Sequence, residues 1–212
     1  MEEKREHQDV RSEVMAVILN ISKSLAKDKL GALFVIADQE SIDGNFRPHY
    51  PQLKFTGNIL SKGMDSVVEK LATLDGAMIF TPEGVLLAYG SRILKSETLL
   101  GYGTKHAAAK GITSFDKDAT AVLVSEESGW IKVFQKGEIV LETDSVDIEP
   151  STLEKISSFL TNKDMALLAS AGIAAASGLA TVPAVLIVGG AYMVVKTAGE
   201  VISSTFKKEK NR

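Results

Sequence analysis

The sequence predicts an α/β protein with a central mixed β-sheet flanked by helices, followed by an apolar C-terminal helical segment. Residues 31–149 alternate apolar runs of strand length with stretches of helical periodicity, and tight turns join several of the strands. The run at 165–195 differs, because its 31 residues include no charged side chain. We therefore divide the chain into an N-terminal helix at 1–30, a globular domain at 31–149 and a helical tail at 150–212.

The composition is that of a globular protein and excludes several classes of function. The chain has 212 residues, of which 45% are hydrophobic and 24% charged. A formal net charge of −3 argues against broad binding of nucleic acid. The absence of cysteine excludes disulfides, zinc–thiolate sites and cysteine nucleophiles, and 3 histidines are too few for a multi-histidine metal cage. The charged N-terminus is unlike a signal peptide, so we expect a cytoplasmic domain.

The first two elements follow from apolar periodicity. Apolar residues at steps of three and four predict one helix before Gly31, packed on the domain through a single face made of Val10, Val14, Val17, Ile18, Ile21 and Leu25. The charged residues 27–29 are expected to end this helix, and Gly31 is a suitable stop. The continuous apolar run Ala32–Ala37 then predicts a strand that is covered on both faces.

The rest of the domain is predicted in the same way. Residues 38–51 are polar, carry Gly and Pro, and indicate a loop. Two helices are expected, at Asp65–Leu74 and Lys105–Lys110. The remaining segments predict strands joined largely by hairpin turns, at Ala77–Phe80, Val85–Tyr89, Ala121–Ser125, Trp130–Gln135 and Glu138–Glu142.

The tail has the composition of a membrane segment. A helix is expected at Ser151–Leu160, with a capping box at its start. The uncharged run at 165–195 exceeds the roughly 20 residues that cross a bilayer, and a basic sequence follows at 207–212. The sequence favours association with a membrane through residues 165–203. A single span would export the basic tail, against the positive-inside tendency, and a hairpin broken near Pro183 would have a short, weakly apolar first arm. A pair of Ala-rich helices buried in an oligomer is the alternative.

Two polar clusters interrupt the apolar pattern of the globular domain. Asp75 and Gly76 stand directly before a strand, where glycine lets a ligand approach the backbone closely. Residues 101–109 form a glycine-flanked turn that runs into a helix, and Lys105 adds a positive charge there. A helix N-terminus of this kind suits a phosphate. Taken singly, each pattern also fits an ordinary turn or a solvated surface.

A third cluster, Ser125-Glu126-Glu127, follows a strand and can supply a metal ligand. In this order the three clusters resemble the diadenylate cyclase (DAC) domain family, which makes cyclic di-AMP and includes the N-terminal domain of the DNA-integrity scanning protein. The resemblance covers about Val10–Glu142. Its matching segments are GALFVI at 31–36, DGA at 75–77, GTKHAA at 103–108 where the family has GTRHRA, and VSEESG at 124–129 where the family has VSEETG.

The resemblance implies that two ATP molecules condense into cyclic di-AMP, with release of two pyrophosphates, across a face-to-face homodimer or higher homo-oligomer. Mn²⁺ or Mg²⁺ would offset the phosphate charge. Asp75 and His106 are then the catalytic residues, and the metal ligands come from Asp75, His106, Glu126 and Glu127. The nucleotide-binding residues are Gly76, Ala77, Leu94, Gly103, Thr104, Lys105, His106, Ala107, Ala108 and Ser125.

One departure from the family pattern leaves two hypotheses open. The family's Arg-His-Arg reads Lys105-His106-Ala107, so one planar guanidinium becomes an ammonium and another cation is lost. Arg92, Lys95 and Lys110 are nearby cations that could compensate. The first hypothesis is an active cyclase, a nucleotidyltransferase. The alternative is a degenerate cyclase domain that senses ATP or cyclic di-AMP and is coupled to a membrane segment.

Overall fold

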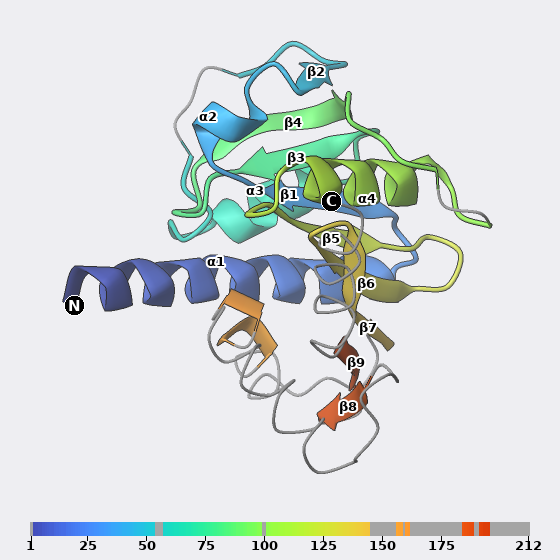
Figure 1. The fold of residues 1–212 in the computed structure, drawn as a ribbon. Helices are drawn as coiled ribbons and strands as arrows, with labels where there is room; N and C mark the ends of the chain where they lie inside the picture. The colour runs from blue at the N-terminus through green and yellow to red at the C-terminus, as the bar shows by residue number, and fades with distance from the viewer. Residues whose placement is uncertain are drawn as a thin grey trace, which may run out of the picture.

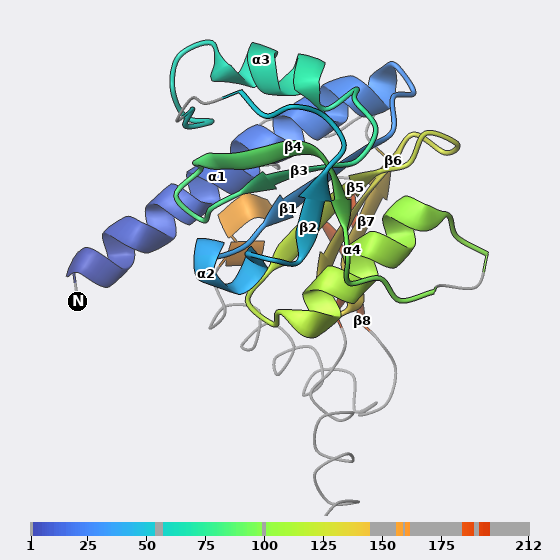
Figure 2. The ribbon, with the colours of Figure 1, turned by 90° about the horizontal axis from the view of Figure 1, so that it is seen from above.

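The computed structural model shows a β-sheet with helices on both faces. It describes residues 2–53, 57–98, 101–144, 156–158, 160–161, 184–188 and 191–195. The long helix α1 (Glu2–Lys27) crosses one face, and α4 (Thr104–Phe115) lies on the opposite face (Figures 1 and 2). The helix α3 (Met64–Leu71) packs beside α1, as Figure 2 shows. This three-layer arrangement confirms the predicted fold class for the globular domain.

The described strands form one mixed sheet. Its order is β2-β4-β3-β1-β5-β6-β7-β9-β8, and among these strands β1 and β3 are the parallel pair. The bounds are β1 Ala32–Ile36, β2 Phe46–Pro48, β3 Ala77–Phe80, β4 Leu86–Ile93, β5 Thr120–Val124, β6 Trp130–Gln135, β7 Glu138–Asp144, β8 Ala184–Val188 and β9 Ala191–Val195.

The burial of β1 explains why polar and apolar residues do not alternate in its sequence. Successive side chains of a strand point to opposite faces. Phe34 packs in the core under α1, whereas its neighbour Val35 packs in the core under α4, and both are fully buried. A strand with a helix layer on each face must be apolar at every position, as predicted.

The predicted N-terminal helix is confirmed, and it ends within the charged residues 27–29, as expected. Val14, Ile18 and Leu25 of α1 are buried, and they lie on the helix face that the periodicity indicated. The helix stops because Lys29 has a φ of 55°, while the N–H of Leu30 donates to the carbonyl of Leu25 over 2.8 Å. This is a left-handed C-terminal cap occupied by lysine, a residue that the cap tolerates less well than glycine.

The expectation of a loop at 38–51 is wrong in part. This segment contains the short helix α2 (Gln39–Ile42) and the edge strand β2, which pairs with β4 from Phe46 to Pro48. Three or four residues are too few to show a period in the sequence, and proline is accepted at a sheet edge. The other predicted helices and strands of the domain occur within a few residues of the expected bounds, although α4 is longer than expected.

In the tail, the structure differs from the predicted helices where it describes the chain. Residues 156–158 and 160–161 are helical, in agreement with the helix expected there. In the apolar run, β8 and β9 are strands instead of helices, and both are rich in β-branched valine and isoleucine, which favour strands. The rest of 165–203, and with it most of the predicted membrane segment, lies outside the described residues. Within them, no helix has both the length and the hydropathy needed to cross a bilayer.

Candidate active site

The sheet register brings the three polar clusters to one edge. Leu33 of β1 lies beside Ala77 of β3, so the segments before both strands, at Gly31 and Asp75, meet at this edge. Because β5 runs antiparallel to β1, its last residue Val124 pairs with Ala32, and the acidic cluster that follows it emerges at the same place. The N-terminal turn of α4 completes the arrangement, since Lys105 lines the hollows formed there.

A first hollow of about 460 Å³ contains most of the predicted phosphate and metal residues. We call it the polar hollow. Its lining combines the first turn of α4, the segment after β5 and one residue of β6. The lining residues are Gly31, Asp75, Gly101, Tyr102, Gly103, Thr104, Lys105, His106, Leu123, Val124, Ser125, Glu126, Glu127, Ser128 and Lys132.

A second hollow of about 360 Å³ contains the other predicted nucleotide residues, and we call it the apolar hollow. Asp75, Thr104 and Lys105 line both hollows and so form a shared wall. The other lining residues come from β1, β3, β4 and α4 and the segments that join them. They are Leu33, His49, Gly76, Ala77, Ser91, Arg92, Ile93, Leu94, Ser96, Ala107 and Ala108. All the predicted site residues therefore line one or both hollows.

Gly76 holds β3 and β4 close together beside this wall. Its φ is 112°, and a Cβ placed there would lie 2.5 Å from the backbone nitrogen of Ser91. Any side chain would therefore collide with the neighbouring backbone, in a conformation that L-residues rarely adopt. Glycine is needed at 76 for close packing of the two strands, and this packing fixes the position of the preceding residue, Asp75.

The first turn of α4 presents its backbone to both hollows. Gly103 is the N-cap in an extended conformation and makes no side-chain cap, so the turn keeps free N–H capacity next to Thr104 and Lys105. The ammonium of Lys105 donates to the carbonyl oxygen of Gly31 over 3.2 Å. A helix N-terminus and an ammonium group thus share one wall, an arrangement that attracts anions.

His106 is neutral in this environment. Its ring stacks on Tyr102, with 4.5 Å between centroids, and meets Phe134 edge-on at 6.3 Å. Burial, and after it the nearby Lys132 ammonium, lower its pKa from 6.5 to about 4, against a smaller opposing effect of Glu142. The Nε2 atom is buried without a hydrogen-bond partner. At neutral pH the imidazole therefore contributes no positive charge to the polar hollow.

The compensating cations suggested by the sequence have different positions. Lys110 forms an ion pair with Glu97 at 3.4 Å, and the Lys95 ammonium lies 4.6 Å from the ring centre of Phe115. Arg92 lines the apolar hollow. Of the three, Arg92 is thus the cation with a side chain at the site.

Sequence reasoning missed Lys132, which is a buried cation of β6 at the polar hollow. Its position in the strand pattern WIKVFQ gives no signal, because a lysine between apolar strand residues normally faces solvent. Sequence reasoning also did not single out Tyr102 or Gly31 as residues of the site. A side chain at Gly31 would meet the Cβ of Glu126 at 3.1 Å and the Nζ of Lys105 at 3.4 Å. The absence of a side chain there lets these two residues approach the strand end.

The predicted metal ligands include three carboxylates at the polar hollow. Asp75, Glu126 and Glu127 are all exposed and line it. In the part of the chain that the structure describes, no three His, Asp or Glu side chains are grouped closely enough to hold a metal ion. Carboxylate oxygens are the donors that Mg²⁺ and Mn²⁺ prefer, and Mg²⁺ commonly takes one or two of them together with substrate phosphates. The donor set fits an ion that is shared with a phosphate.

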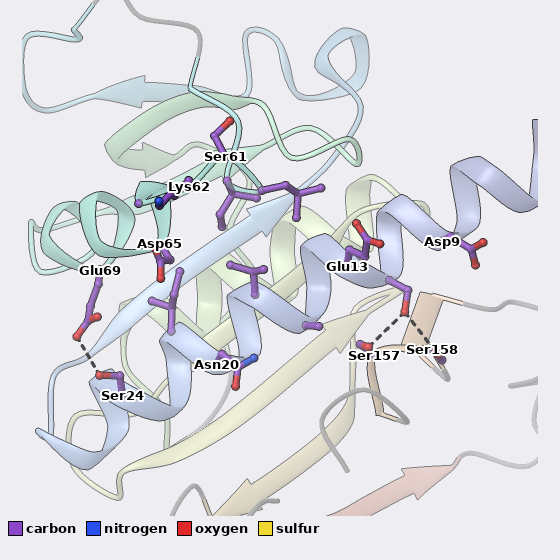
Figure 3. Close-up of a pocket in the computed structure, with 17 residues that line it drawn as sticks. Asp9, Glu13, Asn20, Ser24, Ser61, Lys62, Asp65, Glu69, Ser157 and Ser158 are labelled. Atoms are coloured by element: carbon purple, nitrogen blue, oxygen red, sulfur yellow. Dashed lines mark hydrogen bonds between the residues drawn. The ribbon is translucent and has the colours of Figure 1, made fainter. Parts of the chain in front are cut away.

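A hollow larger than these two lies elsewhere. It measures about 1040 Å³ and runs along α1, between α3 and residues 157–158 (Figure 3). Its lining is mainly polar and acidic, with Ser24 donating to Glu69 over 2.9 Å. None of the residues predicted for the site lines it.

Comparisons with known proteins match the same family that the three polar clusters resemble. The family described as DisA bacterial checkpoint controller nucleotide-binding matches residues 20–139. A protein of Methanocaldococcus jannaschii named diadenylate cyclase is 31% identical over 120 residues, which are 54% of this chain and 38% of that protein. A diadenylate cyclase of Haloferax volcanii is 28% identical over 139 residues, or 62% of this chain and 51% of that one. The chain thus spans about half or less of the length of these relatives.

Two solved structures align with part of this chain. The crystal structure of a double mutant of DacA from Staphylococcus aureus aligns with a TM-score of 0.49 and 26% identity, covering 68% of this chain and 92% of that chain. A hypothetical membrane spanning protein from Bacillus cereus aligns with a TM-score of 0.48 and 22% identity, over 57% of this chain and 59% of the other.

Proposed function

The chain belongs to the diadenylate cyclase family, and we propose that it is a nucleotidyltransferase that condenses two ATP molecules into cyclic di-AMP and two pyrophosphates. The observation that carries the proposal is the gathering of Asp75, the N-terminal turn of α4 and the acidic cluster after β5 around two hollows with a shared wall. A nucleotide needs both an apolar and a phosphate-binding region. The apolar hollow has the larger apolar share of the two, from residues such as Ile93, Leu94 and Ala108, although polar and charged side chains line it too.

We infer one orientation of ATP from the lining of the hollows. The adenine lies in the apolar hollow, where Leu94 and Ala108 contribute apolar surface. The triphosphate lies in the polar hollow against the first turn of α4, with Lys105 as a point charge. The ribose then lies at the shared wall, next to Asp75.

Asp75 is proposed to act on the 3′-hydroxyl of that ribose. The carboxylate orients the hydroxyl and accepts its proton as the oxygen attacks the α-phosphorus of the second ATP. A new bond forms between the 3′-oxygen and the α-phosphorus, and the bond to the bridging oxygen of the leaving pyrophosphate breaks. The second ATP reacts in the same way with the first, so two sites must face each other, one on each subunit of a homodimer.

A divalent ion, Mn²⁺ or Mg²⁺, is part of the proposal. When bound, it neutralises charge on the phosphates and helps to activate the attacking hydroxyl. Asp75 and Glu126 or Glu127 would hold it, together with phosphate oxygens. The neutral state of His106 leaves a lone pair available, but the buried Nε2 has no access to a bound ion without movement of the ring.

A second candidate function is a nucleotide sensor, and the methyl side chain of Ala107 favours it. In the family pattern an arginine occupies this position, whereas here the residue adds only a methyl group to the wall of the apolar hollow. Losing one charge-assisted hydrogen bond to phosphate costs about 1.5–3 kcal/mol, which corresponds to a rate lower by about 10- to 100-fold. Such a site would still bind ATP or cyclic di-AMP.

The test incubates the full chain with ATP and either Mn²⁺ or Mg²⁺ and follows cyclic di-AMP by mass spectrometry. The cyclase predicts a product whose formation depends on the metal and is lost in Asp75→Asn. Binding of ATP or cyclic di-AMP without any product over long incubation would support the sensor instead. Failure to bind either nucleotide would contradict both functions.

A further inference from the structure

The polar hollow contains a cation that the proposed mechanism has not used. Lys132 lies in the middle of β6, and only 7% of its side chain is exposed. It belongs to the strand face that packs toward α4, because its neighbours along the strand, Ile131 and Val133, both pack in the core under α1. Its ammonium end nevertheless lines the polar hollow together with Thr104 and Lys105.

The charge of Lys132 is balanced across the sheet. Lys132 and Glu142 are directly paired residues of β6 and β7, and their side chains form an ion pair with 2.9 Å between Nζ and Oε1. The ammonium also lies 4.5 Å from the ring centre of Tyr102, which forms a cation–π contact. These two contacts balance the positive charge of Lys132 at a depth where an unpaired ammonium would be very unfavourable.

A gain in stability alone does not explain why the chain has a buried ion pair between Lys132 and Glu142. Replacing a buried ion pair with apolar residues of similar size is often neutral or stabilising, because two charges have lost their hydration. An ammonium group has three N–H donors. One carboxylate oxygen and one ring face leave donor capacity, and the polar hollow is the open space that Lys132 borders. A negatively charged group in that hollow would complete its coordination.

The charge at the site also requires a second cation. ATP brings up to four negative charges, and Ala107 supplies none of the positive charge that the family pattern has at that position. Among the residues that line the polar hollow, Lys105 and Lys132 are the lysine and arginine side chains.

We propose that Lys132 is a phosphate-binding residue of this site, whose ammonium contacts the triphosphate of bound ATP and supplies the charge that Ala107 lacks. Glu142 holds the ammonium in place from the neighbouring strand, and Tyr102 covers it on the outer side until the phosphate arrives. The ring of Tyr102 is 44% exposed and stands between Gly101 and Gly103, so it can turn away without displacing α4. The inference rests on the proposed function, in that the bound phosphate compound is ATP.

The first test compares Lys132→Met with the unchanged chain. Methionine keeps much of the length and the apolar stem and removes the charge. We expect binding of ATP and of tripolyphosphate, measured by calorimetry, to weaken by about 10- to 100-fold, while binding of adenosine is unchanged. Lys132→Arg should retain most of the affinity for both phosphates. Equal binding of ATP by Lys132→Met and the unchanged chain would overturn the inference.

The matched controls separate a phosphate contact from a structural ion pair. Lys132→Met leaves Glu142 unpaired and lowers the melting temperature, whereas the double variant with Glu142→Gln removes both charges and should regain stability. A phosphate contact predicts that ATP binding stays weak in this stable double variant. It also predicts that Glu142→Gln alone binds ATP at least as tightly as the unchanged chain, because the ammonium has lost its competing partner. Recovery of ATP binding in the double variant would show that the pair is only structural.

The same experiments distinguish this inference from the cyclase itself. If ATP binding depends on Lys132 but the unchanged chain forms no cyclic di-AMP, the cyclase is wrong and the phosphate contact stands. If cyclic di-AMP forms and Lys132→Met leaves both ATP affinity and the KM for ATP unaltered, the cyclase stands and the phosphate contact is wrong. If the unchanged chain binds neither ATP nor tripolyphosphate, both fail.

Discussion

At the scale of single residues, Ala107 gives the most direct test of the missing cation. Its side chain lines the apolar hollow beside the wall made of Asp75, Thr104 and Lys105. An arginine at this position would bring a guanidinium to that wall, where it can bind phosphate in a bidentate way. We expect Ala107→Arg to raise the rate of cyclic di-AMP formation by about tenfold or more.

The control for this substitution is Ala107→Gln, which adds length without charge and should give no increase. The increase should be larger in a Lys132→Met background, because the two cations then serve the same phosphates and their effects are not additive. A correctly folded Ala107→Arg protein with the original rate would contradict the account of this position.

A second prediction concerns His106 and the change of the free energy of unfolding with pH. Its pKa is lowered from 6.5 to about 4 in the folded chain, so the unfolded chain takes up a proton at a higher pH than the folded chain does. The free energy of unfolding is therefore unaffected by this residue above pH 6.5, falls as pH drops from 6.5 to 4, and levels off below. We expect a loss of roughly 1 kcal/mol, because the ring keeps some solvent contact that screens the effect.

Denaturant unfolding of the unchanged chain and of His106→Gln at several pH values checks this prediction. The variant should lose less stability between pH 6.5 and 4 than the unchanged chain. Identical slopes for the two proteins would mean that the imidazole is protonated normally.

At the scale of elements, the close approach of β3 and β4 at Gly76 predicts a large cost for any side chain. Gly76→Ala would place a Cβ 2.5 Å from a backbone nitrogen at a φ of 112°. Gly44 is a matched control, since its φ is 71° but no atom lies within 4 Å of an added Cβ. We expect Gly44→Ala to lower stability by about 1 kcal/mol and Gly76→Ala by several times as much.

Denaturant unfolding of both variants measures the difference. The excess for Gly76→Ala reports the collision with the backbone of β4 together with the greater strain of a φ of 112°, which lies further from the left-handed helical region than the 71° of Gly44. Equal losses would show that the strands can move apart at this point without consequence for the fold.

Sequence patterns predicted the elements well where a period could be read. The face of α1 with Val14 and Ile18 and the doubly covered strand β1 both follow from apolar spacing. The short elements α2 and β2 were missed, because they carry too few residues to show a period. In β8 and β9 the length of the uncharged run indicated helices, although the valine and isoleucine content of those ten residues indicated strands.

For the site, sequence motifs were sufficient where the residues sit at strand ends and helix starts. Asp75, Thr104 and Glu126 belong to segments with a recognisable order, and the register brings those segments together. Lys132 could not be found in this way. Its role depends on the residue opposite it in β7 and on a ring from a separate turn, and both are relations in space that a single strand does not encode.

At the scale of the whole molecule, the sheet edge explains why one chain would be insufficient for the proposed reaction. In the proposed arrangement the two hollows hold one nucleotide between them. Asp75 lies on their shared wall, and its side chain is exposed. Leu94 and Tyr102, at 50% and 44% exposure, leave further apolar surface open around the same edge. A second subunit facing this edge would bring its own ATP to the 3′-hydroxyl and cover that surface.

This geometry predicts that cyclic di-AMP formation depends on pairs of subunits. The rate per chain should fall on dilution, because dimers dissociate. The variant Asp75→Asn should bind ATP but form no product, and it should also inhibit the unchanged protein. In a mixed dimer only one of the two required attacks has its carboxylate, so the ring of cyclic di-AMP cannot close. With equal amounts of both chains and random pairing, about a quarter of the dimers carry both carboxylates.

Mixing experiments with product detection by mass spectrometry measure this inhibition directly. The control mixes the unchanged protein with Gly44→Ala, whose substitution lies in open surroundings away from both hollows, so that effects of total protein concentration cancel. A rate per unchanged chain that stays constant on dilution and in excess Asp75→Asn would mean that one subunit closes the ring alone. The two nucleotides would then have to bind within one chain, and the assignment of the two hollows to a single ATP would be wrong.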